Sequence, residues 1–193
     1  MSTQQSIAAG SPAPGRLRAD AERNRQRVLQ AAKEAFSSLG FDASHHDIAR
    51  LAQVGVGTVY RRYPERTALL EAVLLDILAD LTSHATRAAA VEADGWQAFE
   101  AVFDKLADTN RRYAGLSDQL AGVASHAVQA ARDDLLDRLQ ALCAHARAHG
   151  LRQDIGPRDL LALAGLFASR DCSLAGGSSQ ALATRVILDG LRR

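Results

Sequence analysis

The sequence predicts an all-α protein, and three observations lead to that prediction. Of the 193 residues, 47% are hydrophobic, so the chain can bury a core of ordinary size. The chain is rich in Ala and Leu and has few runs of β-branched residues, a composition that favours helices. Apolar residues recur at helical spacing along most of its length, and no segment alternates as a strand would.

Three parts are expected along the chain. Residues 1–18 are predicted to be a disordered arm, because the first fifteen are small or polar, include two prolines and lack the apolar segment of a signal peptide. Residues 19–66 are expected to form a small helical unit. Residues 67–193 are expected to form a larger one.

The small unit should contain three helices, at about 19–39, 45–53 and 55–62. The first has an apolar stripe and ends at Gly40. Ser44 is a good N-cap for the second helix, and Asp47 can complete a capping box with it. Pro64 should end the third, because a residue before proline is pushed out of the α region.

The larger unit should contain helices only, separated by capping and breaking residues. Asp94-Gly95, Gly150 and Gly176-Gly177 mark breaks, and Pro157 suits the first turn of a helix. The expected helices cover about 65–91, 96–113, 116–123, 125–149, 158–169 and 179–191.

Charge is distributed unevenly between the two units. From Arg16 to Arg66 there are ten Lys/Arg and six Asp/Glu, a net +4, and from Thr67 to Arg193 there are thirteen and sixteen, a net −3. A cluster of arginines also crowds the start of the first helix, where the helix dipole disfavours positive charge. Either this cluster is a solvated face or it contacts phosphates, and the basic front favours a surface that meets nucleic acid.

Residues 44–66 form the most informative segment. A short helix, a tight turn and a second short helix rich in Tyr and Arg are the pattern of a helix-turn-helix, which places side chains in a DNA major groove. The segment resembles the TetR family of bacterial transcriptional regulators, and the resemblance covers about residues 25–73. The matching motifs are Ala-Ala-x-x-x-Phe with Gly40-Phe41, Ile48-Ala49-x-x-Ala52-x-Val54, Gly57-Thr58-Val59-Tyr60-x-x-Tyr63-Pro64 and Ala68-Leu69.

The chain departs from the family pattern at four positions. Gln53 stands where a turn glycine is usual, so this residue must either avoid a positive φ or adopt one at modest cost. His45 replaces an aliphatic residue, Gly55 replaces a Ser or Thr cap, and Arg66 replaces a Lys and keeps its charge. None of these changes removes a group expected to contact DNA.

The resemblance implies that this segment supplies the DNA contacts. Arg61 should read guanine, and Thr58 can meet a phosphate or a thymine methyl group. Tyr60 and Arg62 are expected to bind phosphates, although both tyrosines of the helix could instead be core residues, the interpretation we favour for Tyr63. The full expected set is Ser44, Arg50, Val56, Gly57, Thr58, Tyr60, Arg61, Arg62 and Arg66.

The larger unit is expected, by the same resemblance, to form a homodimer on a palindromic DNA operator and to bind a small-molecule effector. Its last two helices would form the dimer interface, although their apolar residues would equally suit an ordinary core. A hydrophobic effector would release a repressor from DNA. The expected lining residues are Leu74, Leu78, Phe99, Phe103, Leu106, Leu120, His126, Leu139 and Cys143.

Other function classes are less well supported by the sequence. No catalytic or phosphate-binding motif is present, so we expect neither an enzyme nor a cofactor. His145 and His149 have a spacing that could hold a metal, but Cys143 and His145 point to different faces and no carboxylate or second Cys completes a site, so we expect no metal. Two cysteines outside any CxxC motif and the lack of a membrane span fit a cytoplasmic protein. The main alternative is a helical interaction module that has lost DNA binding.

Overall fold

The structure is a computed structural model that describes residues 14–92, 94–116, 125–168 and 177–193. These residues form helices and no strand, in agreement with the predicted fold class. The elements are α1 (Pro14–Leu39), α2 (His45–Ala52), α3 (Val56–Arg62), α4 (Arg66–Val91), α5 (Gly95–Arg112), α7 (His126–Arg147), α8 (Pro157–Gly165), the 3-10 turn η1 (Leu166–Ala168) and α10 (Gly177–Leu191). The predicted helix at 116–123 lies outside the described residues, apart from Leu116.

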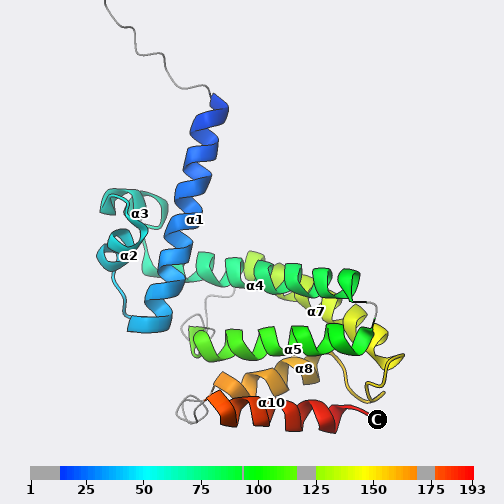
Figure 1. The fold of residues 1–193 in the computed structure, drawn as a ribbon. Coiled ribbons are helices and arrows are strands. Elements are labelled where there is room, and N and C mark those ends of the chain that lie inside the picture. The colour runs from blue at the N-terminus through cyan, green and yellow to red at the C-terminus, as the bar shows by residue number, and fades with distance from the viewer. Residues whose placement is uncertain (1–13, 93, 117–124, 169–176) are drawn as a thin grey trace, which may run out of the picture.

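Helices α1–α3 form a compact unit, here called the head, and the helices from α4 onward form the body (Figure 1). The head core is built from the inward faces of its three helices. Leu29, Ile48 and Val59 are fully buried there, one from each helix. Helix α2 packs on both α1 and α3, so the position of α3 depends on this small core.

The turns of the head follow the local chemistry that the sequence indicated. Ser44 caps α2 through a complete capping box with Asp47. Gln53 adopts the left-handed conformation, with φ 53° and ψ 45°, so the turn lacking glycine takes the positive φ at a modest cost. Tyr63, before Pro64, leaves the helical region at φ −132° and ψ 76° and so ends α3.

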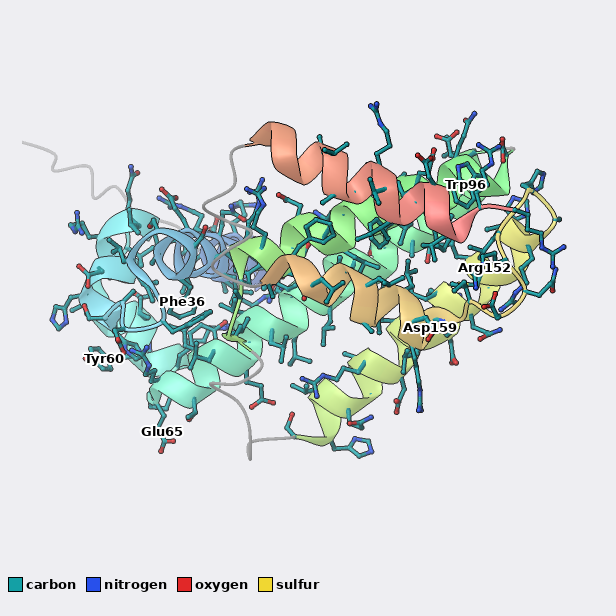
Figure 2. The ribbon with its side chains drawn as sticks, turned by 90° about the horizontal axis from the view of Figure 1, so that it is seen from below. Phe36, Tyr60, Glu65, Trp96, Arg152 and Asp159 are labelled. Atoms are coloured by element: carbon teal, nitrogen blue, oxygen red, sulfur yellow. The ribbon has the colours of Figure 1, made fainter. Side chains whose placement is uncertain are left out.

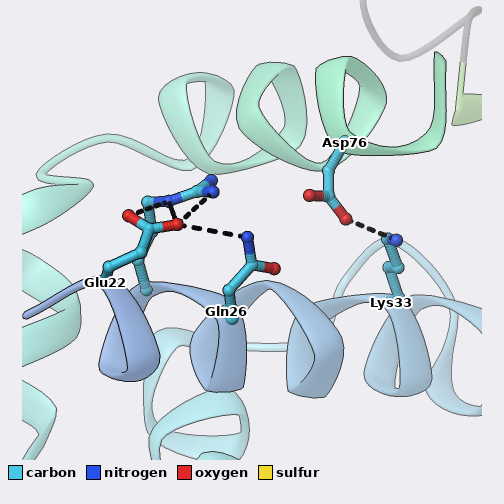
Figure 3. A network of polar contacts seen from close by, with 5 residues as sticks. Glu22, Gln26, Lys33 and Asp76 are labelled. Atoms are coloured by element: carbon cyan, nitrogen blue, oxygen red, sulfur yellow. Dashed lines mark hydrogen bonds and ion pairs between the residues drawn. The ribbon is translucent and has the colours of Figure 1, made fainter. Parts of the chain in front are cut away.

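Helix α1 begins at Pro14, five residues before the predicted start at Ala19. Proline is well suited to a first helical position, because its missing N–H would be unpaired there in any case. Within α1, Glu22 accepts hydrogen bonds from Arg25 and from Gln26 (Figure 3). Such local pairs reduce the repulsion among the arginines at this helix end.

The body is a stack of helices in which α4, α5 and α7 pack against one another and α8 packs on α5 (Figure 1). Phe99, Phe103 and Leu139 are fully buried in its core. Pro157 occupies the first position of α8, as expected, but the helix changes to the 3-10 turn η1 at Leu166. No described helix is long and apolar enough to cross a membrane.

Helix α10 is held mainly at its C-terminal end. Leu188 and Leu191 are buried there, and Leu151 forms an isolated antiparallel bridge with Arg192. The Arg192 guanidinium lies over the Trp96 ring, 5.0 Å from its centroid. In the middle of the helix, Leu182 and Val186 are exposed.

An ion pair joins the head to the body. The Lys33 ammonium on α1 lies 2.5 Å from a carboxylate oxygen of Asp76 on α4 (Figure 3). Both side chains are largely shielded, with 14% and 23% of their surface exposed. The pair fixes where α1 crosses α4.

Candidate nucleic-acid interface and cavity

Helix α3 presents a bare backbone to solvent at its N-terminal end. Gly57 is exposed, and a Cβ placed on it would meet no atom within 4 Å. A Cβ on Gly55, the N-cap, would meet only the Thr58 hydroxyl at 4.0 Å. Val56 between them is partly buried against the head core, so it anchors the helix while the glycines leave room for a groove edge.

Arginines from two helices line one cleft beside this surface. Arg61 and Arg62 are exposed on α3 and, with Thr58, face Arg25 of α1 across a cleft of about 580 Å³. Arg25 donates to Glu22 at 2.6–2.9 Å. The arginine cluster of the first helix had suggested phosphate contact without singling out one residue, and the structure places Arg25 next to the predicted reader.

The two tyrosines of the segment have different environments. Tyr63 is 7% exposed and belongs to the core, which agrees with the interpretation favoured from the sequence. Tyr60 is 44% exposed and lies at the outer edge of the head, far from Trp96 at the other end of the molecule (Figure 2). Its ring stacks on His45, with centroids 4.5 Å apart.

Two contacts explain why a histidine suits position 45. Its Nε2 lies 2.9 Å from the Tyr63 carbonyl oxygen, while its ring supports Tyr60. The imidazole therefore bridges the start of α2 to the end of α3. An aliphatic residue would supply packing but not this hydrogen bond.

The remaining predicted DNA contacts lie at the two ends of α2 and at the start of α4. The Ser44 hydroxyl donates to Asp47 at 2.6 Å, and the backbone N–H of Ser44 donates to the same carboxylate. The two hydrogen bonds hold the pKa of Asp47 below its usual value. Exposed Arg50 lies 3.3 Å from the same carboxylate. Arg66 is half-buried and lies 3.5 Å from Asp42, so it also ties down the loop between α1 and α2.

A cavity of about 270 Å³ lies between α4, α5 and α7. Three predicted lining residues, Leu74, Leu78 and Leu106, line it. Four others lie in the buried core and not among the lining residues: Phe99, Phe103, Leu139 and Cys143. His126 is exposed at the first position of α7, and Leu120 lies outside the described residues.

The same cavity has lining residues that the sequence did not indicate. They include Thr109, Asn110, Tyr113 and Arg132, so the cavity is not purely apolar. Their helical spacing places them on inward faces, since Thr109, Asn110 and Tyr113 follow buried Leu106 by three, four and seven residues, and Arg132 precedes buried Leu135 by three. Their polar or charged side chains are what set them apart from the apolar residues predicted for the lining.

The described residues contain no cluster of three or more His, Cys, Asp or Glu that could hold a metal ion. Burial raises the pKa of the Cys143 thiol to about 11, so at neutral pH the thiol carries a proton and is a poor metal ligand. The rings of His145 and His149 meet edge to face, with centroids 4.9 Å apart, and pack at the end of α7.

Comparisons with known proteins agree with these two regions. Residues 28–73 match the family described as bacterial regulatory proteins, tetR family. Residues 94–193 match the C-terminal domain described as transcriptional regulator SbtR-like. No curated protein sequence matches the chain.

Solved structures are similar over nearly the whole chain. A TetR transcription regulatory protein from Mycobacterium vanbaalenii is 34% identical, with 92% of this chain and 99% of that chain covered and a TM-score of 0.72. A TetR transcriptional regulator from Streptomyces coelicolor is 31% identical, with coverage of 87% and 98% and a TM-score of 0.69. The TetR-like regulator LfrR from Mycobacterium smegmatis, solved in complex with proflavine, shares the fold at 22% identity, with coverage of 88% and 94% and a TM-score of 0.69.

Proposed function

Because this chain belongs to the TetR family of bacterial transcriptional regulators and is a DNA-binding regulator, we propose that α3 is the helix that reads its operator. The observation that carries this proposal is the open N-terminal half of α3, where a backbone at Gly57 without side-chain cover adjoins exposed Arg61 and Arg62. Arg61 would make base contacts in the major groove. Arg62, Arg25 and Tyr60 would bind phosphates and set the register.

The regulator would act as a homodimer on a palindromic operator, because one helix-turn-helix contacts too few base pairs for tight specific binding. Large apolar side chains are exposed on the last helices of the body: Leu166 is 59% exposed, and Leu182 and Val186 are 61% exposed. A second copy packing on α10 and η1 would bury them. This arrangement suits the predicted dimer interface of the last two helices.

The regulator would be a repressor that a small molecule releases from DNA. Helix α4 supports this proposal, because it carries both the Asp76 carboxylate that holds α1 and the Leu74 and Leu78 walls of the cavity. A ligand that pushes on these leucines would shift α4 and with it the spacing of the two heads. The proflavine complex of LfrR shows a small molecule bound by a protein of this fold.

Two arginine variants test the assignment of the reading helix. Arg61→Ala should reduce the preference for the operator over scrambled DNA by roughly 1–3 kcal/mol, because it loses a bidentate base contact. Arg66→Ala should weaken binding to both DNAs and lower the salt slope by about one unit. Fluorescence anisotropy with DNA from upstream of the gene measures both, and Arg138→Ala, a surface change on α7, is the matched control.

An unchanged sequence preference in Arg61→Ala would remove Arg61 from the proposed role. If the wild-type chain bound neither DNA, the alternative of a helical interaction module without DNA binding would replace the regulator. The exposed arginines of α3 favour the regulator, since a module that does not bind DNA does not need positive charges on this helix.

A further inference from the structure

The body cavity contains one charged side chain among its described lining residues. Arg132 of α7 lines it together with leucines and an isoleucine from α4, α5, α7 and α8. No Asp or Glu is among those lining residues. A guanidinium always carries its positive charge and only donates hydrogen bonds, so this wall of the cavity is permanently cationic.

Arg132 makes no ion pair or hydrogen bond within the described parts of the chain. The acidic residues that follow it on α7 are engaged elsewhere: Asp133 accepts from Gln129 at 3.0 Å, and Asp134 pairs with Arg138 at 3.4 Å. On α4, Glu71 accepts from the Ser125 hydroxyl. The protein therefore supplies no described counter-ion to the one cation of the cavity.

A half-buried guanidinium next to apolar walls is better satisfied by an anion than by water alone, because charge-assisted bonds are strongest where water is partly excluded. We propose that the cavity binds an organic anion with an apolar body, and that Arg132 holds its carboxylate or similar acidic group. This inference rests on the proposed function, and it narrows the expected hydrophobic effector to an amphipathic anion.

The rest of the cavity fits such a molecule. Leu74, Leu78 and Leu106 are buried and offer an apolar surface for the body of the ligand. Thr109 and Tyr113 are half-buried and add hydroxyl groups that can donate. Burial raises the pKa of Tyr113, which keeps its hydroxyl protonated as a donor. A volume of about 270 Å³ limits the ligand to a small molecule.

The test compares ligands of equal length and different charge on the full chain. Butanoate, hexanoate, octanoate and decanoate are titrated by calorimetry beside the alcohol and the alkylammonium ion of each length. We expect the wild-type chain to bind at least one carboxylate more tightly than its alcohol, and to bind the ammonium ion least. Arg132→Gln should weaken carboxylate binding by about ten- to a hundredfold, the loss of a hydrogen bond to a charged group, and leave alcohol binding unchanged.

Two further variants keep the test decisive. Arg138→Gln removes a charge from the same helix outside the cavity and should bind like the wild type. Arg132→Lys keeps the charge, so it should still prefer carboxylates, and it serves if Arg132→Gln does not fold. The proposal is overturned if the wild-type chain binds no carboxylate more tightly than its alcohol, or if Arg132→Gln keeps that preference.

DNA binding measured in the same samples separates this inference from the proposed function. If a carboxylate binds through Arg132 but leaves the DNA complex intact, the anion site is supported and the proposal that a ligand releases the repressor from DNA is wrong. If a carboxylate releases DNA equally from the wild type and from Arg132→Gln, release by a ligand is supported and the proposed anion site is wrong.

Discussion

The head and the body place their candidate sites in opposite ways. The head exposes its site to solvent, with Gly57, Arg61 and Arg62 exposed on a seven-residue helix. The body encloses its site in a cavity, with Arg132 among buried leucines from several helices. The head positions its site through a small core and local caps, and the body through packing between distant segments. A substitution that removes the same volume should therefore destabilise the head more than the body.

The largest effect on stability is expected for a substitution in the head core. Ile48→Ala empties a fully buried position on α2 and should lower the free energy of unfolding by about 2–5 kcal/mol. DNA binding should then be lost on warming before the body loses its helical signal. Circular dichroism and DNA anisotropy over the same temperatures measure the two. Leu39→Ala, at a position 58% exposed, is the control and should change neither.

The second largest effect on stability is expected for the ion pair between the head and the body. Lys33→Met removes one partner of the shielded pair with Asp76 and should cost about 2 kcal/mol, the value of a charged hydrogen bond. Urea unfolding measures the cost. The double variant Lys33→Met with Asp76→Leu should recover part of it, because no unpaired charge remains. Equal stability of Lys33→Met and the wild type would mean that the pair does not couple head and body.

The cap of α2 should have the smallest effect. Ser44→Ala should cost about 1 kcal/mol at neutral pH, because the N-cap hydroxyl is lost. The folded protein holds the pKa of Asp47 below its usual 3.8, so the ionised carboxylate favours folding above that pH. This contribution disappears as the pH falls through the lowered pKa. The stability difference between the two proteins should therefore shrink in acid, as urea titrations at several pH values would show.

The same contrast explains how much could be predicted from the sequence. The capping box of Ser44 and Asp47, the end of α3 at Tyr63 and the burial of Tyr63 are set by neighbours within a few residues, and all were predicted. The start of α1 was placed too late, because proline was interpreted as part of the arm rather than as a first helical residue. These signals are local, so the chain reports them directly.

The cavity is different, because its lining depends on how α4, α5 and α7 meet. Three of the nine expected lining residues line it, whereas Phe99 and Leu139 point into closed core. Arg132 was not predicted because its charge suggests a solvent-facing residue, although it lies three residues before buried Leu135 on the inward face of α7. That no described residue pairs with it is known only from the folded body.

The most direct measurement is DNA binding by the wild-type chain and by Gly57→Leu, with upstream and scrambled DNA at two salt concentrations. A Cβ at Gly57 would meet no atom within 4 Å, so the variant should fold. If the open front of α3 enters the major groove, the wild type will prefer the upstream DNA at both salt concentrations, and the variant will lose that preference. A folded Gly57→Leu protein that binds the upstream DNA as the wild type does would show that another surface reads the operator.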